Sequence, residues 1–383
     1  MSQSANQVLT APQDYKQLTQ DLQNRGRAQL GTLSVEKVDT RAHHEHDGHE
    51  AVYRITDPSV GLVAFVGVHN TNLGPAMGGT RLWAYATQDQ ALTDVLRLSK
   101  GMTYKSALAG LPLGGGKAVI MASVDQKTPA LLTSYANALN IIGGQYLTAA
   151  DVNTNQHDMD VIQNTSPFVA GVTVARGGRG DPSDATAYGV FRAVQATIEH
   201  KFGRSDMTGL RVAIQGLGSV GYDLAKQLKQ VGCELVVADV NAARVQQAAT
   251  ELGAKVVDVS DIHRADCDLF SPCALGAILN EQSIPEMKAA AICGGANNQL
   301  KVVGDGERLV SSQKLYAPDY AANAGGIIKV CAEYLKWDVQ QVNDKVARIK
   351  DTLSQIYQTA QAQSIRPEQA ADQLAKQAFM KQA

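Results

Sequence analysis

The fold of this chain is decided by the stretch Val212-Ala213-Ile214-Gln215-Gly216-Leu217-Gly218-Ser219-Val220-Gly221. A short apolar run, typical of a buried strand, ends at three glycines with G-x-G-x-x-G spacing, and a helical pattern follows. The first glycine permits a tight turn, the second lets a pyrophosphate approach the backbone, and the third lets the helix pack close to the strand. Free N–H groups at the helix N-terminus favour the bound anion.

Strand and helix patterns alternate outward from this turn. Strands are predicted at 211–215 and 234–239, and helices at 219–231 and 242–252. Such alternation is typical of a doubly wound (Rossmann) parallel sheet with helices on both faces. Asp239 ends the second strand, where its carboxylate can bind ribose hydroxyls and would repel a 2′-phosphate. We therefore predict an NAD site, with a purely structural glycine turn as the alternative. The residues assigned to this site are Gly216, Leu217, Gly218, Ser219, Val220, Gly221, Asp239 and Val240.

Two lysines, Lys105 and Lys117, lie in the segment Gly101-Met102-Thr103-Tyr104-Lys105-Ser106-Ala107-Leu108-Ala109-Gly110-Leu111-Pro112-Leu113-Gly114-Gly115-Gly116-Lys117. Their neighbours are mostly glycine, alanine and leucine. Poor hydration and a second ammonium group both lower the pKa of a lysine. The segment therefore indicates an amine that can act as a base near neutral pH. Two exposed lysines that flank a turn are the alternative.

The rest of the first half also mixes strands and helices. Strands are predicted at 50–56, 61–69, 118–121 and 146–149, and helices at 88–99, 129–142 and 186–202. Residues 338–383 are predicted to be almost wholly helical, with Pro367 in the first turn of the last helix. The length of 383 residues indicates two α/β domains.

Composition excludes several classes of function. The net charge of −2, with 44% hydrophobic and 19% charged residues, gives no electrostatic reason to bind nucleic acid or an anionic membrane. We expect a cytoplasmic protein, because neither a signal peptide nor a membrane-spanning run is recognised. The five cysteines are expected to be reduced and mostly buried. The histidines in 43–49 are expected to form a solvated loop, with no metal bound.

Six segments, in order along the chain, carry a resemblance to a known family. They are 73–81 (Leu73-Gly74-Pro75-Ala76-Met77-Gly78-Gly79-Thr80-Arg81), the two-lysine segment, 148–152 (Thr148-Ala149-Ala150-Asp151-Val152), the glycine turn, 295–300 (Gly295-Ala296-Asn297-Asn298-Gln299-Leu300) and 316–326 (Tyr316-Ala317-Pro318-Asp319-Tyr320-Ala321-Ala322-Asn323-Ala324-Gly325-Gly326). The chain resembles the glutamate/leucine/phenylalanine/valine dehydrogenases, most of all the branches that act on apolar amino acids.

The resemblance implies a role for each matching position. Lys117 would be the catalytic amine, and Asp151 would exchange a proton with the substrate nitrogen and water; a helix N-cap is the alternative for Asp151. Lys105 would bind the substrate carboxylate with backbone N–H groups around Gly78 and Gly79. The remaining residues implied to contact the substrate are Met77, Ala149, Asn298, Ile327 and Val330. Further residues implied to contact the cofactor are Thr186, Cys273, Ala274, Asn297 and Asn323. For Cys273 a purely structural role is favoured over thiol chemistry.

The resemblance also implies an overall organisation and a reaction. It implies a substrate-binding and oligomerisation domain (31–172), an NAD-binding Rossmann domain (173–350), and C-terminal helices (351–383) that pack back on the first domain, with the substrate in a cleft between the domains. Residues 1–30, which are rich in Gln, Asn and Ser, are predicted from composition to form a loosely packed helical arm beyond what the resemblance requires. The implied reaction is the reversible oxidative deamination of an L-amino acid to the 2-oxo acid and ammonium by a homo-oligomer. It uses NAD and no metal.

The preferred side chain is left open between two classes. The uncharged residues Met77, Ala149, Ile327 and Val330 disfavour glutamate, because an unpaired buried carboxylate is costly. Ile327 and Val330 favour leucine, valine or isoleucine, whereas 151–155 resembles the phenylalanine branch, so phenylalanine or tryptophan is the alternative. A non-catalytic NAD-binding protein is a more remote alternative. The effect of Lys329 is not assigned.

Overall fold

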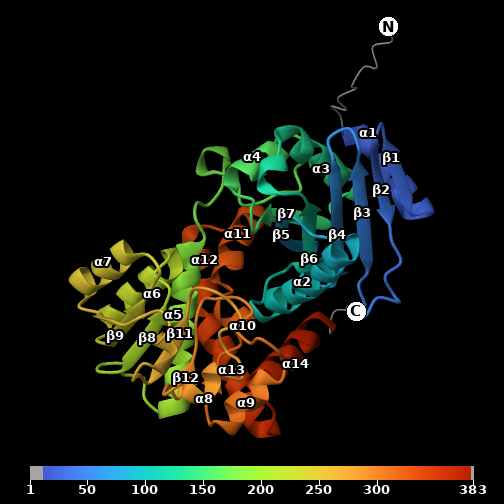
Figure 1. Cartoon of the computed structure of the whole chain (residues 1–383). Coiled ribbons are helices and arrows are strands. Elements are labelled where there is room, and N and C mark those ends of the chain that lie inside the picture. Colours follow the sequence, from blue (N-terminus) through green and yellow to red (C-terminus); the bar gives the residue numbers. More distant parts are fainter. Residues whose placement is uncertain (1–11, 381–383) are drawn as a thin grey trace. The chain divides into compact units, whose positions relative to one another are not determined.

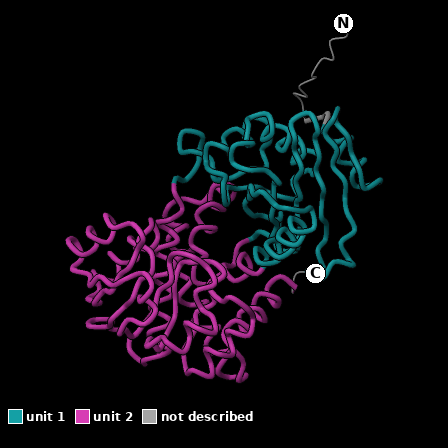
Figure 2. Tube along the Cα trace, in the orientation of Figure 1, with its two compact units in different colours: residues 1–103, 112–180, 382–383 teal, residues 104–111, 181–381 magenta. Residues whose placement is uncertain are grey.

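The computed structural model describes residues 12–380, which divide by their contacts into two compact units (Figure 2). Unit 1 holds the described residues up to Thr103 together with Pro112–Gly180. Unit 2 holds Tyr104–Leu111 and the described residues from Asp181 onward. Both units mix helices with a sheet (Figure 1), which confirms the predicted α/β class with two parts.

Unit 1 is built on a mixed sheet with the strand order β1-β2-β3-β4-β6-β5-β7. The first four strands and β6 pair in antiparallel fashion, while β5 runs parallel to both β6 and β7. The strands are β1 (Arg27–Leu30), β2 (Leu33–Lys37), β3 (Ala51–Asp57), β4 (Leu62–Asn70), β5 (Ala76–Trp83), β6 (Gly114–Met121) and β7 (Tyr146–Ala150).

Helices cover both faces of this sheet. They are α1 (Pro12–Arg25), α2 (Gln88–Leu108), α3 (Pro129–Ile142) and α4 (Gln156–Gln163), with short 3₁₀ turns η1 (Val124–Gln126) and η2 (Val174–Arg176). One apolar core joins α3 to the side chain of Ile120, and another joins α2 to Val119. Because neighbouring residues of a strand point to opposite faces, the two cores lie on opposite sides of β6.

Local sequence explains where these helices begin and end. The Thr128 hydroxyl accepts a hydrogen bond from the Leu131 N–H, Pro129 takes the first helical position, and Gly143 ends α3 at a φ of 73°. Thr87 accepts from the Gln90 N–H at 3.2 Å, as the predicted N-cap of α2. That helix runs nine residues beyond its predicted end at residue 99, because Tyr104 and Ala107 are also buried.

The N-terminal arm and three strands differ from prediction. Of the arm 1–30, residues 1–11 lie outside the described part of the structure, and α1 is packed by its buried Leu22 rather than loose. The strands β1 and β2 were not predicted. Strand β5 was not predicted because Gly78 and Gly79 interrupt its apolar pattern, and glycine normally weakens a strand.

Unit 2 is built on a wholly parallel sheet with the order β10-β9-β8-β11-β12-β13. The order reverses between β8 and β11, which is the switch point where α/β sheets bind ligands. The strands are β8 (Arg211–Gln215), β9 (Glu234–Ala238), β10 (Lys255–Val256), β11 (Leu269–Pro272), β12 (Ala291–Ile292) and β13 (Leu315–Tyr316). The predicted doubly wound sheet is therefore confirmed.

The helices of unit 2 agree closely with the predicted ones around the glycine turn. They are α5 (Ser183–Phe202), α6 (Ser219–Gln230), α7 (Ala242–Leu252), α8 (Ser283–Glu286), α9 (Asp305–Ser311), α10 (Asp319–Ala322), α11 (Gly325–Leu335), α12 (Val339–Ala347), α13 (Ile349–Gln363) and α14 (Pro367–Met380), with the 3₁₀ turn η3 (Ile262–Arg264). As predicted, Pro367 begins the last helix.

The C-terminal helices are grouped with unit 2, and their predicted packing on the first domain stays a prediction. Tyr357 of α13 bonds to the Thr197 hydroxyl of α5, at 2.8 Å. The segment 104–111 joins this unit because Tyr104 stacks edge-on against Phe379 and Lys345 donates to the Gly110 carbonyl. Within residues 12–380, no helix combines the length and the apolar character needed to cross a bilayer.

The expected solvated loop at 43–49 contains one buried member. His49 Nε2 lies 3.0 Å from both the Leu96 carbonyl and the Ser99 hydroxyl of α2. His69 of β4 lies edge-on to it and contacts Thr103 at 2.8 Å. Burial lowers the pKa of each imidazole to about 4; the nearby charge of Lys100 lowers it further, whereas Asp47 opposes the shift.

Acid is therefore expected to destabilise unit 1. Folding favours neutral His49 and His69, so their contribution to stability is present above about pH 6.5 and is lost as pH falls toward 4. Each histidine should cost roughly 2 kcal/mol between pH 7 and 5, as measured by urea unfolding. His49→Gln should reduce that loss, and His44→Gln, an exposed control, should leave it unchanged. Equal pH dependence in all three proteins would refute the assignment.

Candidate active site

Three parallel strands bring charged side chains to one face of the sheet of unit 1. Ala118 packs in the core beside α3, so Lys117 lies on the opposite face, which α2 covers. Thr80 contacts Tyr135 of α3, so Arg81 shares the face of Lys117. Asp151 directly follows β7. The order β6-β5-β7 places Arg81 on the strand between the other two residues.

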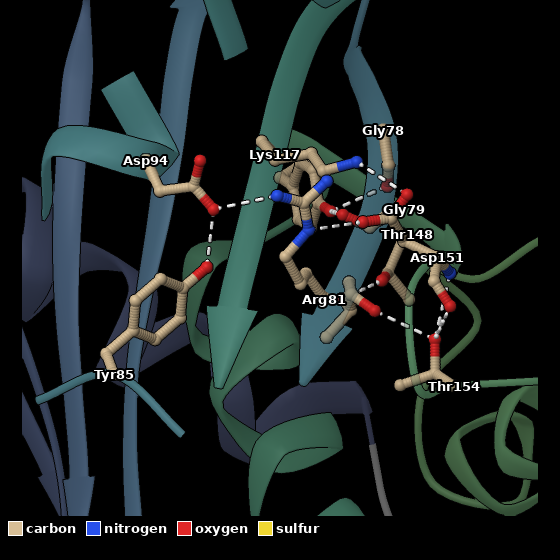
Figure 3. Close-up of polar contacts among 11 residues, drawn as sticks. Gly78, Gly79, Arg81, Tyr85, Asp94, Lys117, Thr148, Asp151 and Thr154 are labelled. Atoms are coloured by element: carbon tan, nitrogen blue, oxygen red, sulfur yellow. Dashed lines mark hydrogen bonds and ion pairs between the residues drawn. The ribbon is translucent and has the colours of Figure 1, made fainter. Parts of the chain in front are cut away.

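The Asp151 carboxylate joins two cations (Figure 3). Its Oδ1 lies 3.1 Å from Lys117 Nζ, and its Oδ2 lies 3.0 Å from Arg81 Nε. Lys117 is 5% exposed and Asp151 is half-buried, so Lys117 is not one of a pair of surface lysines, which was the alternative. Asp151 is not a helix N-cap, since Asn155 caps α4. The alternatives for both catalytic candidates are therefore wrong.

Burial and charge together set the ionisation of this pair. Burial lowers the pKa of Lys117, Asp151 opposes this, and the positive charge of Arg81 lowers the pKa further. Burial raises the pKa of Asp151, but Lys117 and Arg81 outweigh it, so the pKa is lowered. The site can therefore keep a carboxylate ionised beside an amine that loses its proton more readily than ordinary lysine.

Two glycines of β5 make this approach possible. A Cβ atom on Gly79 would lie 2.7 Å from the Cβ of Asp151, in the space between β6 and β7. A Cβ atom on Gly78 would lie 1.9 Å from the Gly116 carbonyl oxygen. Tyr146 donates its hydroxyl proton to the Gly78 carbonyl at 2.6 Å. Any side chain at these positions would separate the strands that carry Lys117 and Asp151.

Two further predicted substrate residues share the face of Lys117. Met77 and Ala149 alternate with residues that face α3, and both are buried, at 1% and 7% exposure.

Lys105 lies on the last turn of α2, in the segment grouped with unit 2. Its charge opposes the rise that burial causes in the pKa of Asp319.

The predicted dinucleotide turn forms at the end of β8. Gly216 has a φ of 92°, which only glycine adopts readily, and its N–H donates to the Ala238 carbonyl at 2.8 Å. A Cβ atom on Gly221 would lie 2.0 Å from the Gly216 carbonyl oxygen, whereas Gly218 faces open space. Ser219 begins α6. Gly216 therefore permits the tight turn and Gly221 lets α6 pack close to β8. Gly218 leaves the backbone open to approach by a pyrophosphate, as the pattern predicts.

The carboxylate of Asp239 is fixed beside this turn. It accepts hydrogen bonds from the backbone N–H groups of Leu217, at 2.6 Å, and Asn241, at 2.7 Å. Val240, also predicted to contact the cofactor, is 90% exposed. A groove of about 580 Å³ runs past Leu217, Gly218 and Ser219. The start of α6 at this groove favours an anionic group such as a phosphate.

Other predicted cofactor residues gather at the ends of β11 and β12. Cys273 Sγ accepts the Gly295 N–H at 3.5 Å, and burial raises the pKa of the thiol, which supports a structural role. Ala274 touches the turn, because the space above Gly216 is closed by its methyl group. Asn323 donates to the Asn297 side chain at 2.8 Å. Among residues 12–380 no partner is found for the buried Asn323 Oδ1, so a cofactor hydroxyl would satisfy it.

The last candidates lie on α5, on α11 and in the loop after β12. Thr186 donates its hydroxyl proton to the Pro182 carbonyl at 3.0 Å, and Ile327 and Val330 are half-exposed on α11. Asn298 has a φ of 52°, in the left-handed region. Lys329, which had no assigned effect, forms an ion pair with Asp184 at 2.7 Å and so ties α11 to the start of α5.

Sequence reasoning missed the residues that support Asp151. Arg81 was noted only as part of a family segment, and Asp94 and Tyr85 were not considered. Arg81 follows Gly79 by two residues, so strand alternation could have placed it on the face of Lys117. No sequence signal links Asp94 of α2 to Arg81, because only the packing of the helix on the sheet brings them together.

Two family models match most of the chain. Residues 49–167 match the family model described as Glu/Leu/Phe/Val dehydrogenase, dimerisation domain. Residues 177–247 and 237–382 match the model described as Glutamate/Leucine/Phenylalanine/Valine dehydrogenase.

Individual relatives cover most of the chain. Leucine dehydrogenase of Geobacillus stearothermophilus is 42% identical over 330 residues, 86% of this chain and 90% of that protein. Valine dehydrogenase of Streptomyces virginiae is 40% identical over 343 residues, 88% and 96% of the two chains. The crystal structure of L-tryptophan dehydrogenase from Nostoc punctiforme superposes with a TM-score of 0.80 at 37% identity, covering 88% and 97%. The chain belongs to the glutamate/leucine/phenylalanine/valine dehydrogenase family.

Proposed function

We propose that this protein catalyses the reversible, NAD-dependent oxidative deamination of an apolar L-amino acid, with leucine, valine or isoleucine favoured. The observation that carries the proposal is the ion pair of buried Lys117 with half-buried Asp151, with 3.1 Å between the amine and the carboxylate. Bound NAD⁺ would accept the hydride from the substrate Cα. The glycine turn, Asp239 and Asn323 of unit 2 would hold it.

Lys117 would act as the base. As a neutral amine it would take a proton from the water that attacks the substrate iminium carbon. Burial supports this role because it lowers the pKa of Lys117 toward working pH. In the reverse direction the ammonium form would polarise the carbonyl of the 2-oxo acid.

Asp151 would handle the second proton. Its carboxylate stays ionised beside Lys117 and Arg81, and so can accept a proton from the substrate nitrogen and return it to the leaving ammonia. Lys105, with backbone N–H groups around Gly78 and Gly79, would bind the substrate carboxylate.

The substrate preference rests on four uncharged residues at positions that the family resemblance assigns to the substrate. Met77 and Ala149 lie on the face of Lys117, and Ile327 and Val330 are available on α11. A glutamate side chain would find no cation among these four residues. Relatives named leucine and valine dehydrogenase share about two-fifths of the sequence and support the branched-chain preference. The tryptophan dehydrogenase relative keeps an aromatic substrate as the second candidate.

The cofactor preference and assembly belong to the same proposal. Asp239 accepts two backbone N–H bonds that hold its carboxylate beside the turn, where it would repel the 2′-phosphate of NADP. Residues 49–167 match a model described as a dimerisation domain, which supports a homo-oligomer.

A substrate panel tests this proposal. With NAD⁺ at alkaline pH, kcat/KM for leucine, valine or isoleucine should exceed that for glutamate at least a hundredfold, because the glutamate carboxylate would be left unpaired. NADP⁺ should be at least tenfold poorer than NAD⁺. Formation of NADH is measured by its absorbance. A preference for phenylalanine or tryptophan would select the aromatic alternative. If no amino acid is oxidised, the result would favour the alternative of a non-catalytic NAD-binding protein.

A further inference from the structure

The two oxygens of Asp151 have separate partners, and this division bears on catalysis. Oδ1 contacts Lys117 Nζ at 3.1 Å, while Oδ2 accepts from Arg81 Nε at 3.0 Å. The backbone of Asp151 is also fixed, since its N–H donates to Thr154 at 2.9 Å and Thr154 donates to the Thr80 carbonyl. Each carboxylate oxygen has its own partner and the backbone of Asp151 is fixed as well, which restricts rotation of the carboxylate toward Lys117.

Arg81 is itself held by a second carboxylate. Its Nη1 donates to Asp94 Oδ2 at 2.9 Å, and the Tyr85 hydroxyl donates to the same oxygen (Figure 3). The side chains of Arg81 and Asp94 are 23% and 27% exposed. A guanidinium group is planar and presents several N–H donors in a fixed fork, so it can bridge two carboxylates in one orientation. Lysine, with a single nitrogen, cannot reproduce that bridge.

We propose that Arg81, fixed by Asp94 and Tyr85, is a positioning residue that occupies Asp151 Oδ2 and leaves only Oδ1 to Lys117. This inference rests on the proposed roles of Lys117 and Asp151 as the proton-handling pair. Without Arg81, both carboxylate oxygens would be available to the lysine. The amine would then be held as an ammonium ion and would be a poorer base.

Electrostatics acts in the same direction as the geometry. The charged groups that face Lys117 are Asp151 after β7, Arg81 on β5 and Asp94 on α2. Tyr85 is linked to these groups by its hydrogen bond to Asp94. Arg81 lowers the pKa of Lys117 and of Asp151 alike. Its loss would therefore let Lys117 keep its proton to a higher pH.

Arg81→Gln tests the proposal in the full-length protein. The acid limb of the profile of kcat/KM against pH should move up by about one pH unit, since one cation a few ångströms away is removed. At the pH that is optimal for wild type, kcat should fall at least tenfold while NADH binding stays unchanged. Arg81→Lys keeps the positive charge and should restore much of the pH profile, but it should restore little of kcat, because it lacks the fork that orients Asp151. Asp94→Asn removes a carboxylate that raises the pKa of Lys117, so the acid limb should move slightly down, while kcat should fall because Arg81 is held less firmly.

A second readout is independent of turnover. In protein labelled with carbon-13 at the lysine Cε, the resonance missing from Lys117→Ala identifies Lys117, and its shift follows protonation. The midpoint should rise by about one pH unit in Arg81→Gln. Arg97→Gln, which removes an exposed arginine of the same helix as Asp94, should leave it unchanged. If wild type oxidises no amino acid, the proposed function fails, yet this titration still reports on Arg81.

The outcomes that overturn the proposal are specific. An Arg81→Gln variant whose Lys117 titrates at the wild-type midpoint would show that Arg81 does not act on the amine. A uniform loss of activity at every pH, in parallel with a lower melting temperature, would assign Arg81 a structural role only.

Discussion

Lys117→Ala is expected to reduce oxidative deamination at least a hundredfold while NADH still binds. The variant removes the amine that lies 3.1 Å from Asp151 Oδ1, and general base catalysis typically contributes a factor of this size. Asp151 would keep its contact with Arg81, so the buried carboxylate would not be left without a cation. Folding should therefore survive the change. Steady-state rates with the preferred amino acid and NADH binding by fluorescence are the measurements.

The control for this variant is Lys37→Ala, which removes an exposed lysine of β2 in the same unit. It should leave both rate and binding unchanged. Turnover of Lys117→Ala close to that of wild type would show that another group acts as the base. The assignment would also fail if Lys117 titrated as fully charged at every pH where the enzyme is active, because an ammonium ion cannot take a proton.

Replacing two glycines of the turn by alanine, one at a time, should distinguish an effect on cofactor binding from an effect on folding. Gly218 has a φ of −65° and open space around its Cα, so Gly218→Ala should change stability by less than about 0.5 kcal/mol. Its methyl group would stand where the pyrophosphate approaches the backbone. We expect NADH to bind at least tenfold more weakly, as measured by calorimetry.

Gly221→Ala should weaken both the stability of the fold and the binding of NADH. Its Cβ atom would lie 2.0 Å from the Gly216 carbonyl oxygen, so α6 would have to move away from β8, at a cost of more than about 2 kcal/mol. NADH binding should be lost. Gly304→Ala is the matched control, because Gly304 also faces open space at a φ of −64°. If Gly218→Ala bound NADH with wild-type affinity, the glycine turn would not be part of the cofactor site.

Much of the fold could be predicted from local signals. The strand 211–215 and the helix 242–252 were predicted with the bounds that β8 and α7 have, because the strand–turn–helix pattern repeats with clear apolar periodicity. Strand β5 could not be predicted in the same way. Gly78 and Gly79 look like a turn in sequence, and only the approach of β6 and β7 on either side explains why a strand contains them.

The residues of the candidate site also differ in whether the sequence could identify them. Sequence identified Lys117 and Asp151 because both lie in segments that resemble a family. It left open whether each side chain was buried or exposed, since burial depends on what packs above the strand. The pair Arg81–Asp94 joins a strand to a helix, and residues from different elements meet only when the chain is folded.

The sequence by itself determined the glycine turn, the alternating elements of unit 2 and the family, because these depend on neighbours along the chain. Only the tertiary structure decided that Lys117 is buried, that Asp151 divides its two oxygens between Lys117 and Arg81, and that Asp94 holds Arg81 in place. The physical reason is that ionisation depends on hydration and on charges a few ångströms away. Those distances are set by strand register and by helix packing, which no local pattern encodes.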